Sequence, residues 1–262
     1  MTRLVHLSDL HFGRDRAELA APLRGCLEEL APELVIVSGD LTQRARKHQF
    51  AEARTFLDGL GLPWLAVPGN HDTPLDNLFL RFLRPFSRFR AAVSAQLEPV
   101  HLGDGYTVVG LNTVNPQAWQ SGKLRRRSLR HVERALAERD GFGLVVMHHP
   151  PEMAPGDRKR GMRGAERGLR ELAHMGADLV LCGHLHVWRA MPLRAEASIL
   201  MLQAGTGLSN RLRGEPNDFN LLEIDDCDVL VSRYGAGSDE AQFQRLSRTR
   251  FRKEDARWEV LT

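Results

Sequence analysis

The sequence predicts an α/β fold in which parallel strands come from consecutive βαβ units. Two observations lead to this prediction: short apolar runs alternate with amphipathic segments of helical period, and polar side chains follow the runs at a nearly constant interval. The chain has 262 residues, of which 42% are hydrophobic, and this is enough to bury a sizeable core. We therefore expect one domain over residues 1–262, without a linker or an internal repeat.

The first part of the chain contains three predicted strands and two predicted helices. Residues 34–38 (LVIVS) are a continuous apolar run, which is typical of a buried strand, and residues 3–8 and 64–67 also have strand character. Between these runs, apolar side chains recur every three or four positions in residues 16–31 and 50–60. This period predicts one helix after each of the first two strands.

The remaining chain continues with strands and helices and ends in strands. Residues 101–111 carry a Gly-Asp-Gly turn between short apolar runs, which predicts a hairpin. Apolar runs at 144–147 and 178–182 predict two more buried strands. The tail, residues 187–262, consists mainly of strand-like runs, and we expect it to form a mostly antiparallel second sheet packed on the first. The predicted helices of this part lie near residues 73–93, 123–139 and 167–175.

Polar side chains follow each predicted strand at the point where it ends. Asp40 follows Asp9 by 31 positions and Asn70 follows Asp40 by 30, which is the length of about one βαβ unit. Because ligands bind outside the carboxyl ends of the strands in such sheets, we expect these side chains to share one edge. With the ends of the two later strands added, the candidate metal ligands are Asp9, His11, Asp40, Asn70, His148, His184 and His186.

These candidates are imidazoles, carboxylates and one amide oxygen, without a thiolate. Such a mixed set suits Mn²⁺, Fe or Zn²⁺ better than Mg²⁺ or Ca²⁺. Seven groups are too many for one tetrahedral ion, whereas a shared carboxylate would let them hold two. Two adjacent metal ions can stabilise both the attacking and the leaving oxygen of an in-line displacement at phosphorus. The sequence thus predicts two metal ions and phosphoryl-transfer chemistry.

The order of these motifs resembles the calcineurin-like metallophosphoesterase superfamily over nearly the whole chain. The motifs are Asp9-x-His11, Gly39-Asp40, Gly69-Asn70-His71-Asp72, His148-x-Pro150 and Gly183-His184-x-His186. The resemblance implies a four-layer αββα sandwich with two mixed β-sheets. It also implies one metal ion held by Asp9, His11, Asp40 and His186, and a second held by Asp40, Asn70, His148 and His184, so that Asp40 bridges the two.

The resemblance also implies catalytic roles for His71 and Asp72. His71 matches the family's catalytic histidine, which protonates the leaving group or stabilises charge in the transition state, and Asp72 would orient it. The GNHD motif and residues 204–220 are most similar to the class III cyclic-nucleotide phosphodiesterase group. One departure follows Asp40, where many relatives carry an acidic residue and this chain has Leu41-Thr42-Gln43.

We therefore predict hydrolysis of a phosphodiester, such as a 3′,5′-cyclic nucleotide or another small phosphodiester. The nucleophile would be a hydroxide bridging the two metal ions, attacking in line, with His71 assisting. Three alternatives stay open: a nuclease acting on DNA or RNA, a phosphomonoesterase of the same fold, and a metal-free binding scaffold. A net charge of +3 and an aromatic content of 6% are low for a dedicated nucleic-acid binder.

Composition also bears on compartment and partners. No apolar run approaches the roughly 18 residues that a membrane span needs, and the first residues lead directly into a strand without a cleavage site. Three widely spaced cysteines argue against a disulfide framework, so we expect a cytoplasmic protein. Whether the chain forms a homodimer is left open. So are the roles of His149, which is adjacent to a candidate ligand, and of Arg211 and Arg213, which are candidate donors to a substrate phosphate.

Overall fold

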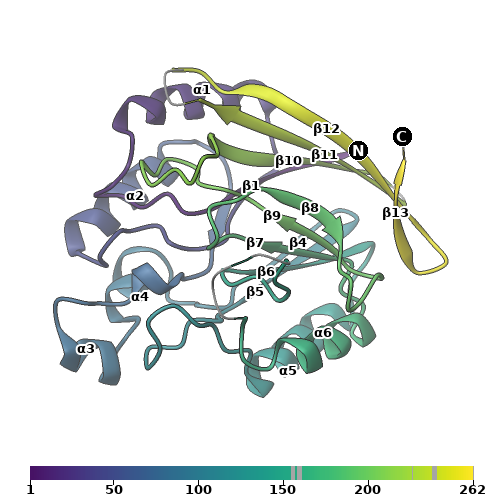
Figure 1. Ribbon diagram of the computed structural model, residues 1–262, viewed down its shortest axis with the longest axis horizontal. Helices are drawn as coiled ribbons and strands as arrows, with labels where there is room; N and C mark the ends of the chain where they lie inside the picture. The colour runs from purple at the N-terminus through teal and green to yellow at the C-terminus, as the bar shows by residue number, and fades with distance from the viewer. Residues whose placement is uncertain (155–156, 158–160, 226, 238–240, 262) are drawn as a thin grey trace.

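The computed structural model describes residues 1–154, 157, 161–225, 227–237 and 241–261 and contains two mixed β-sheets (Figure 1). The first sheet has seven strands in the order β13-β12-β11-β10-β1-β2-β3. β1, β2 and β3 are parallel, as the βαβ pattern predicts, and the remaining pairs are antiparallel. The strands are β1 (Thr2–Leu7), β2 (Leu34–Val37), β3 (Trp64–Ala66), β10 (Asn217–Asp225), β11 (Asp228–Ala236), β12 (Gln244–Glu254) and β13 (Arg257–Leu261).

The second sheet has six strands in the order β4-β5-β6-β7-β9-β8. Its four central strands are parallel, and an antiparallel strand flanks them on each edge. The hairpin predicted near residues 101–111 is present as the antiparallel pair of β4 and β5. The strands are β4 (Val100–Gly103), β5 (Tyr106–Leu111), β6 (Phe142–Met147), β7 (Leu179–Cys182), β8 (Arg189–Pro192) and β9 (Leu200–Gln203).

Helices cover the outer face of each sheet (Figure 1). α1 (Ala20–Leu30) and α2 (Lys47–Asp58) lie on the first sheet, and α5 (Arg126–Leu136) and α6 (Ala165–His174) lie on the second. Among the described residues, none of the helices combines the length and the apolar character that crossing a membrane requires. The remaining helical segments are α3 (Leu78–Leu83), α4 (Ser87–Ala92) and the 3₁₀ turns η1 (Ala17–Leu19) and η2 (Asn70–Asp72).

Three apolar clusters separate these layers. In β2, Val35 and Val37 pack toward α1 and α2, while Leu34 and Ile36 point to the opposite face of the strand. There they meet side chains of the second sheet such as Val146. A third cluster lies between the second sheet and α5 and α6. The order helix, sheet, sheet, helix confirms the four-layer αββα sandwich.

The division of strands between the two sheets differs from the expectation. The sequence pattern assigns the second sheet to residues 187–262, and this assignment is wrong for β10 to β13. β10 pairs with the free edge of β1, so these four strands extend the first sheet. Of the strands described in the tail, β8 and β9 join the second sheet. The cause is that β10 is buried over eight of its nine residues, and a continuously buried strand fits the centre of either sheet.

A buried polar chain of hydrogen bonds crosses the first sheet at His6. Trp188 Nε1 donates to Asn220 Oδ1 (2.6 Å), which leaves the Asn220 amide to donate to His6 Nδ1 (3.2 Å). His6 Nε2 then donates to the Ser38 hydroxyl (2.9 Å). Because Nδ1 already accepts a hydrogen bond, the network fits only the neutral imidazole. Burial lowers the pKa of His6 to about 3, although the negative charge of Asp9 opposes this shift.

This lowered pKa predicts a pH dependence of stability. Between the ordinary histidine value of about 6.5 and about 3, the unfolded chain binds a proton at His6 that the folded chain does not. The contribution of His6 is therefore complete above that window and is lost as the pH falls through it. Between pH 7 and pH 5 we expect the unfolding free energy of the wild type to fall by about 2 kcal/mol more than that of His6→Gln. Urea unfolding at both pH values measures this difference. An equal fall in the unfolding free energy of the wild type and of His6→Gln would contradict the prediction.

Candidate metal centre

The structure brings all seven candidate ligands together at the carboxyl ends of five strands. Asp9 and His11 follow β1, Asp40 follows β2 and Asn70 follows β3. From the second sheet, His148 follows β6, and His184 and His186 follow β7. Each of the seven has a polar atom within 3.7 Å of another member, and all except the half-buried Asn70 are buried. The two sheets therefore contribute to one common site.

The first cluster is formed by Asp9, His11 and His186, with Asp40 at its edge. Asp9 Oδ1 lies 3.1 Å from His186 Nε2 and 3.4 Å from His11 Nε2. The two imidazole nitrogens are 3.2 Å apart, and Asp40 Oδ2 lies 3.7 Å from His11 Nε2. Asp9 Oδ1 is buried and has no hydrogen-bond partner among the described residues. Asp9 Oδ1 and the Nε2 atoms of His11 and His186 thus converge, and hydrogen bonds among them cannot satisfy all three atoms.

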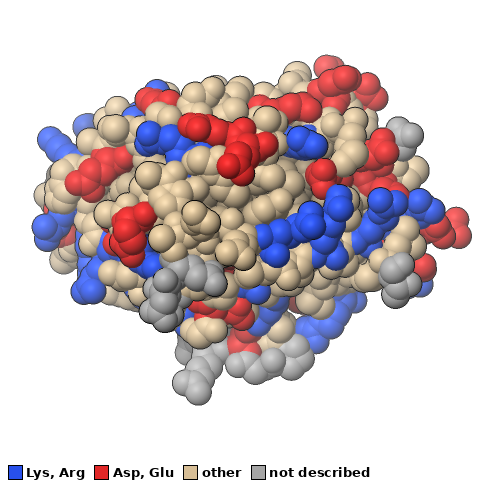
Figure 2. Space-filling view, turned by 90° about the horizontal axis from the view of Figure 1, so that it is seen from above, with Lys and Arg blue, Asp and Glu red and all other residues tan. Residues whose placement is uncertain are grey.

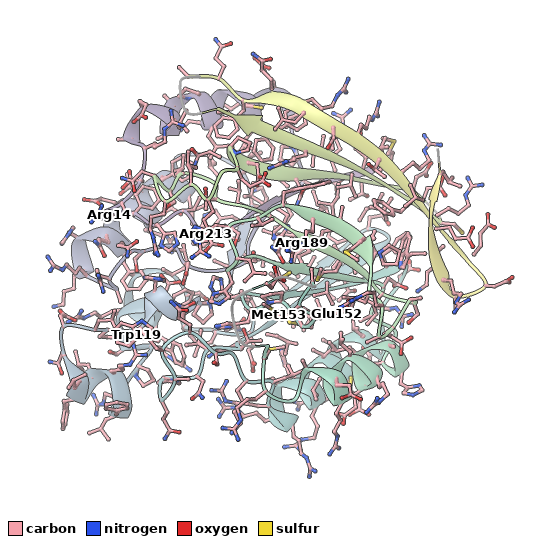
Figure 3. The ribbon with its side chains drawn as sticks, viewed as in Figure 1. Arg14, Trp119, Glu152, Met153, Arg189 and Arg213 are labelled. Atoms are coloured by element: carbon pink, nitrogen blue, oxygen red, sulfur yellow. The ribbon has the colours of Figure 1, made fainter. Side chains whose placement is uncertain are left out.

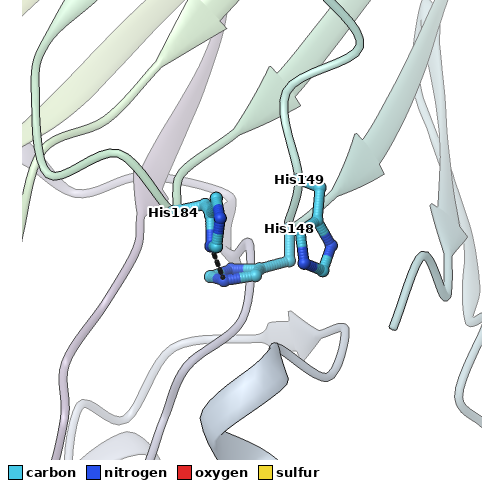
Figure 4. Close-up of side chains that lie close together, drawn as sticks. All are labelled: His148, His149 and His184. Atoms are coloured by element: carbon cyan, nitrogen blue, oxygen red, sulfur yellow. Dashed lines mark hydrogen bonds between the residues drawn. The ribbon is translucent and has the colours of Figure 1, made fainter. Parts of the chain in front are cut away.

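The second cluster surrounds His148 Nε2. This atom lies 3.2 Å from Asp40 Oδ2, 3.1 Å from Asn70 Oδ1 and 3.2 Å from His184 Nδ1. Figure 4 shows the rings of His148 and His184 facing each other through these nitrogens, with His149 beside them. One imidazole nitrogen carries at most one proton, so it cannot donate to three neighbours at once. A cation between these atoms would satisfy all of them.

Backbone carbonyls fix the tautomers of two histidines so that their lone pairs point into the clusters. His148 Nδ1 donates to the carbonyl of Ser38 (2.9 Å), and His186 Nδ1 donates to the carbonyl of Arg211 (3.1 Å). Carbonyl oxygens only accept, so in the neutral rings Nδ1 carries the proton and Nε2 carries the lone pair. Metal-binding histidines are typically oriented in this way, by a hydrogen bond from the second ring nitrogen. The donor set therefore fits metal ions.

Each of the two carboxylates accepts hydrogen bonds with one oxygen and directs the other oxygen toward the clusters. Asp9 Oδ2 accepts hydrogen bonds from the Ser8 hydroxyl (2.6 Å) and the His184 amide (2.9 Å), which leaves Oδ1 facing the imidazoles. Asp40 Oδ1 accepts from the His71 amide (2.7 Å), which leaves Oδ2 facing both His11 and His148. Asp40 Oδ2 is thus the atom that the two clusters share.

The electrostatics of the site favours positive charge. Burial alone raises the pKa of Asp9 and Asp40, but the surrounding imidazoles outweigh this effect and hold both pKa values well below the usual range. Burial lowers the pKa of His148, yet the Asp40 carboxylate raises it to about 9. Ionised carboxylates buried at this depth require cationic partners. Bound metal ions would supply that charge.

The local backbone is strained where the candidate ligands lie. Five of the seven have a positive φ, between 52° and 73°: Asp9, His11, Asp40, His184 and His186. Left-handed conformations cost non-glycine residues about 1–2 kcal/mol each, and such strain clusters at functional sites. The glycines of the motifs have a packing role, because a Cβ at Gly69 would collide with the Asp40 carboxylate and one at Gly183 with the Ser8 hydroxyl.

Among the described residues, Asp72 makes no hydrogen bond to the His71 ring that it was expected to orient, and this expectation is corrected. Its carboxylate accepts hydrogen bonds from the amides of Leu41 (3.2 Å), Thr42 (2.9 Å) and Gly69 (2.9 Å) and from the Thr42 hydroxyl (3.0 Å). Burial, together with the negative charge of Asp40, raises the pKa of Asp72 to about 7. The Asp72 carboxylate therefore joins the loops that carry Asp40 and Asn70.

Gln43 and Arg211 hold the ring of His71 instead. His71 Nδ1 donates to the carbonyl of Gln43 (2.8 Å), so its Nε2 is the atom directed to the site. Arg211 Nη1 lies 3.4 Å from that Nε2. His71 is half-buried and its ring lies edge-on to His11, with 4.9 Å between centroids. Arg213, the other arginine singled out in this loop, is exposed.

His149 lies behind the second cluster. Its Nδ1 is 2.8 Å from the Thr113 hydroxyl, and its ring centroid is 4.6 Å from that of His184. Its ligand atom, with those of His148 and His184, falls within the spacing of a metal-binding triad. Thr113 was not identified from the sequence. Its position after the carboxyl end of β5, at the same edge of the sheets, is the signal that could have indicated it.

Fold and site together define a metallophosphoesterase. The chain belongs to the calcineurin-like phosphoesterase family, whose model matches residues 2–188. It is 29% identical over 199 residues to a probable cyclic nucleotide phosphodiesterase of Synechococcus, covering 70% of this chain and 72% of that protein. It is 28% identical over 201 residues to the glycerophosphodiester phosphodiesterase GpdQ of Enterobacter lignolyticus, covering 70% of each. A solved structure with the same fold is a dimetal phosphatase from Danio rerio, with a TM-score of 0.66, 12% identity and coverage of 94% of this chain and 98% of that one.

Proposed function

We propose that the chain is a phosphodiesterase that uses two metal ions. The observation that supports this most is the convergence of Asp40 Oδ2, Asn70 Oδ1 and His184 Nδ1 on His148 Nε2, where one proton cannot serve all three neighbours. Asp9, His11, Asp40 and His186 would hold one ion, and Asp40, Asn70, His148 and His184 the other. Two such ions would lower the pKa of a bound water and neutralise the charge on the phosphate oxygens. Mn²⁺, Fe or Zn²⁺ suits this donor set.

His71 would act on the leaving group. Its Nδ1 is committed to the Gln43 carbonyl, so a transferable proton must sit on Nε2 of the imidazolium form. Nε2 lies 3.4 Å from Nη1 of Arg211, and both residues line the pocket beside the metal centre. The reaction forms one bond from a water oxygen to phosphorus and breaks one phosphorus–oxygen ester bond. The leaving oxygen takes the proton from His71.

The relatives support a diester substrate. One is named a probable cyclic nucleotide phosphodiesterase and another a glycerophosphodiester phosphodiesterase, so both names specify phosphodiester hydrolysis. A nuclease is the second candidate, on the strength of the arginines near the site. Figure 2 shows a row of basic side chains on the face seen from above, with acidic side chains beside it. On β12, Arg248 pairs with Glu223 and Arg252 pairs with Asp228, so part of the basic charge of this strand is neutralised within the protein.

A substrate panel tests the proposal. The protein, loaded with Mn²⁺ after purification without chelators, is assayed on bis(p-nitrophenyl) phosphate, 3′,5′-cyclic AMP, glycerophosphocholine, p-nitrophenyl phosphate and single-stranded DNA. We expect diesters to be preferred over the monoester, two metal ions per chain, and loss of activity with a chelator. Steep loss of DNA cleavage with rising salt would identify the nuclease. Fewer than one metal ion per chain, or activity on the monoester alone, would refute the proposal.

A further inference from the structure

A pocket of about 560 Å³ lies beside the metal centre and is markedly basic. Asn70 and His71 are among its lining residues, so it is continuous with the candidate active site. Its size is within the usual range for pockets that bind small molecules, roughly 300–1,000 Å³. Four guanidinium groups line it and no carboxylate does: those of Arg14, Arg44, Arg46 and Arg211.

Among the described residues, these four arginines lack the close carboxylate partner that several other arginines have. Arg88, Arg189 and Arg233 each contact a carboxylate at 2.6–2.9 Å. Within the part of the chain that the structure describes, none of the four pocket arginines has a carboxylate oxygen within 4.0 Å. Arg14, Arg44 and Arg46 are exposed and Arg211 is half-buried, so the pocket presents four positive charges to which an anionic ligand would be attracted. Guanidinium groups match phosphate oxygens in geometry, since both can form paired hydrogen bonds.

Arg211 connects the pocket to the reaction. Its backbone carbonyl accepts from His186 Nδ1 (3.1 Å), and its guanidinium lies 3.4 Å from His71 Nε2. A group bound at Arg211 would therefore be next to the atom proposed to protonate the leaving oxygen. With His71 as the proton donor, the pocket would lie on the leaving-group side of the scissile phosphate, and the arginines would face the departing alcohol.

An exposed aromatic ring stands at the rim of the pocket. Trp119 lines the pocket and is 67% exposed. Figure 3 labels Trp119 and Arg14 on the side of the molecule where α2 and α4 lie. The guanidinium of Arg81 lies 5.8 Å from the Trp119 ring centroid, and Arg81 is fixed by the Thr73 hydroxyl (3.0 Å). A nucleobase can stack on such a ring whatever its identity, because every base has a π-face.

We propose that the substrate is a phosphodiester whose leaving alcohol is a nucleoside carrying a further phosphate group. The pocket arginines would bind that second phosphate, and Trp119 would stack on the base. This inference rests on the proposed function and adds the chemical class of the leaving group. In the hydrolysis, water forms the new bond to phosphorus and the phosphorus–oxygen ester bond breaks. The phosphorylated nucleoside departs as an alcohol.

The test compares three dinucleotides on the Mn²⁺-loaded protein. These are d(ApA) and its derivatives with a phosphate on the 5′ end or on the 3′ end, so that either direction of cleavage places a phosphate on the leaving alcohol. We expect kcat/KM for at least one phosphorylated dinucleotide to exceed that for d(ApA) by roughly 10- to 100-fold, as for a charged hydrogen-bonded contact. In the double variant Arg44→Gln, Arg46→Gln we expect this ratio to fall toward one. The double variant Arg126→Gln, Arg130→Gln, which removes two exposed arginines of α5, should keep the ratio.

Equilibrium binding gives a second readout that does not depend on turnover. Calorimetry should show that deoxyadenosine 5′-phosphate, or the 3′-phosphate, binds the wild type at least tenfold more tightly than deoxyadenosine, and that the Arg44/Arg46 double variant loses most of this difference. Hydrolysis of bis(p-nitrophenyl) phosphate without any preference for a phosphorylated dinucleotide would overturn this inference and leave the proposed function intact. Absence of hydrolysis of every diester would overturn both.

Discussion

Replacement of Asp40 by Asn is expected to lower kcat for bis(p-nitrophenyl) phosphate by roughly 10²- to 10³-fold or more. Asp40 Oδ2 is the atom that both clusters share, at 3.7 Å from His11 Nε2 and 3.2 Å from His148 Nε2. An amide in its place carries no negative charge. Because Oδ1 accepts from the His71 amide, the new NH₂ group would also point its hydrogens at the two imidazoles. We expect the bound metal to fall from two ions per chain to one or fewer.

The measurement combines kinetics with metal analysis by mass spectrometry. Asp58→Asn is the matched control, because it makes the same chemical change at an exposed residue of α2. Circular dichroism and thermal unfolding of both variants separate loss of the centre from loss of the fold. An Asp40→Asn variant that keeps two metal ions and full turnover would contradict the assignment of Asp40 as a bridging ligand.

The sequence predicts the ligand positions well because they depend on a rule of sheet topology. Parallel strands present their carboxyl ends at one edge, so Asp9, Asp40 and Asn70 had to lie near one another once βαβ spacing was recognised. His148 and His184 follow strands of the second sheet, so this rule alone does not place them next to Asp9 and Asp40. The packing of the two sheets brings the two edges together.

The rest of the site depends on contacts that local pattern does not contain. Gln43 holds His71 through a backbone carbonyl, an atom that every residue possesses, so its identity gave no signal. The amides of Leu41 and Thr42 donate hydrogen bonds to the Asp72 carboxylate. These bonds compete with the expected pairing of Asp72 with the neighbouring His71 ring. The basic pocket combines arginines near residues 14, 44–46 and 211, and only the fold brings these segments together. β10 pairs with the edge of β1, and the periodicity within a strand does not indicate with which strand it pairs.

Replacement of His71 by Ala is expected to have an effect that depends on the leaving group. A general acid contributes about 10²–10⁴-fold where the leaving oxygen is strongly basic, and p-nitrophenolate departs with little need for a proton. We therefore expect kcat/KM for an alkyl diester such as d(ApA) to fall by roughly 10²- to 10⁴-fold. The loss for bis(p-nitrophenyl) phosphate should be clearly smaller. The Asp40→Asn variant, by contrast, should lose both activities to a similar extent, because it affects the whole centre.

The unequal loss of activity on the two diesters distinguishes proton donation by the His71 ring from a disturbance of the metal centre. The His71 side chain contacts Gln43 and Arg211 on one side and His11 on the other, so its removal could also disturb the first cluster. Such a disturbance would lower the metal content and reduce both activities together. His48→Ala, at an exposed position of α2, serves as the control for loss of an imidazole. Two metal ions per chain with unequal losses would identify His71 as the proton donor, whereas equal losses at full metal content would leave it only a role in stabilising charge.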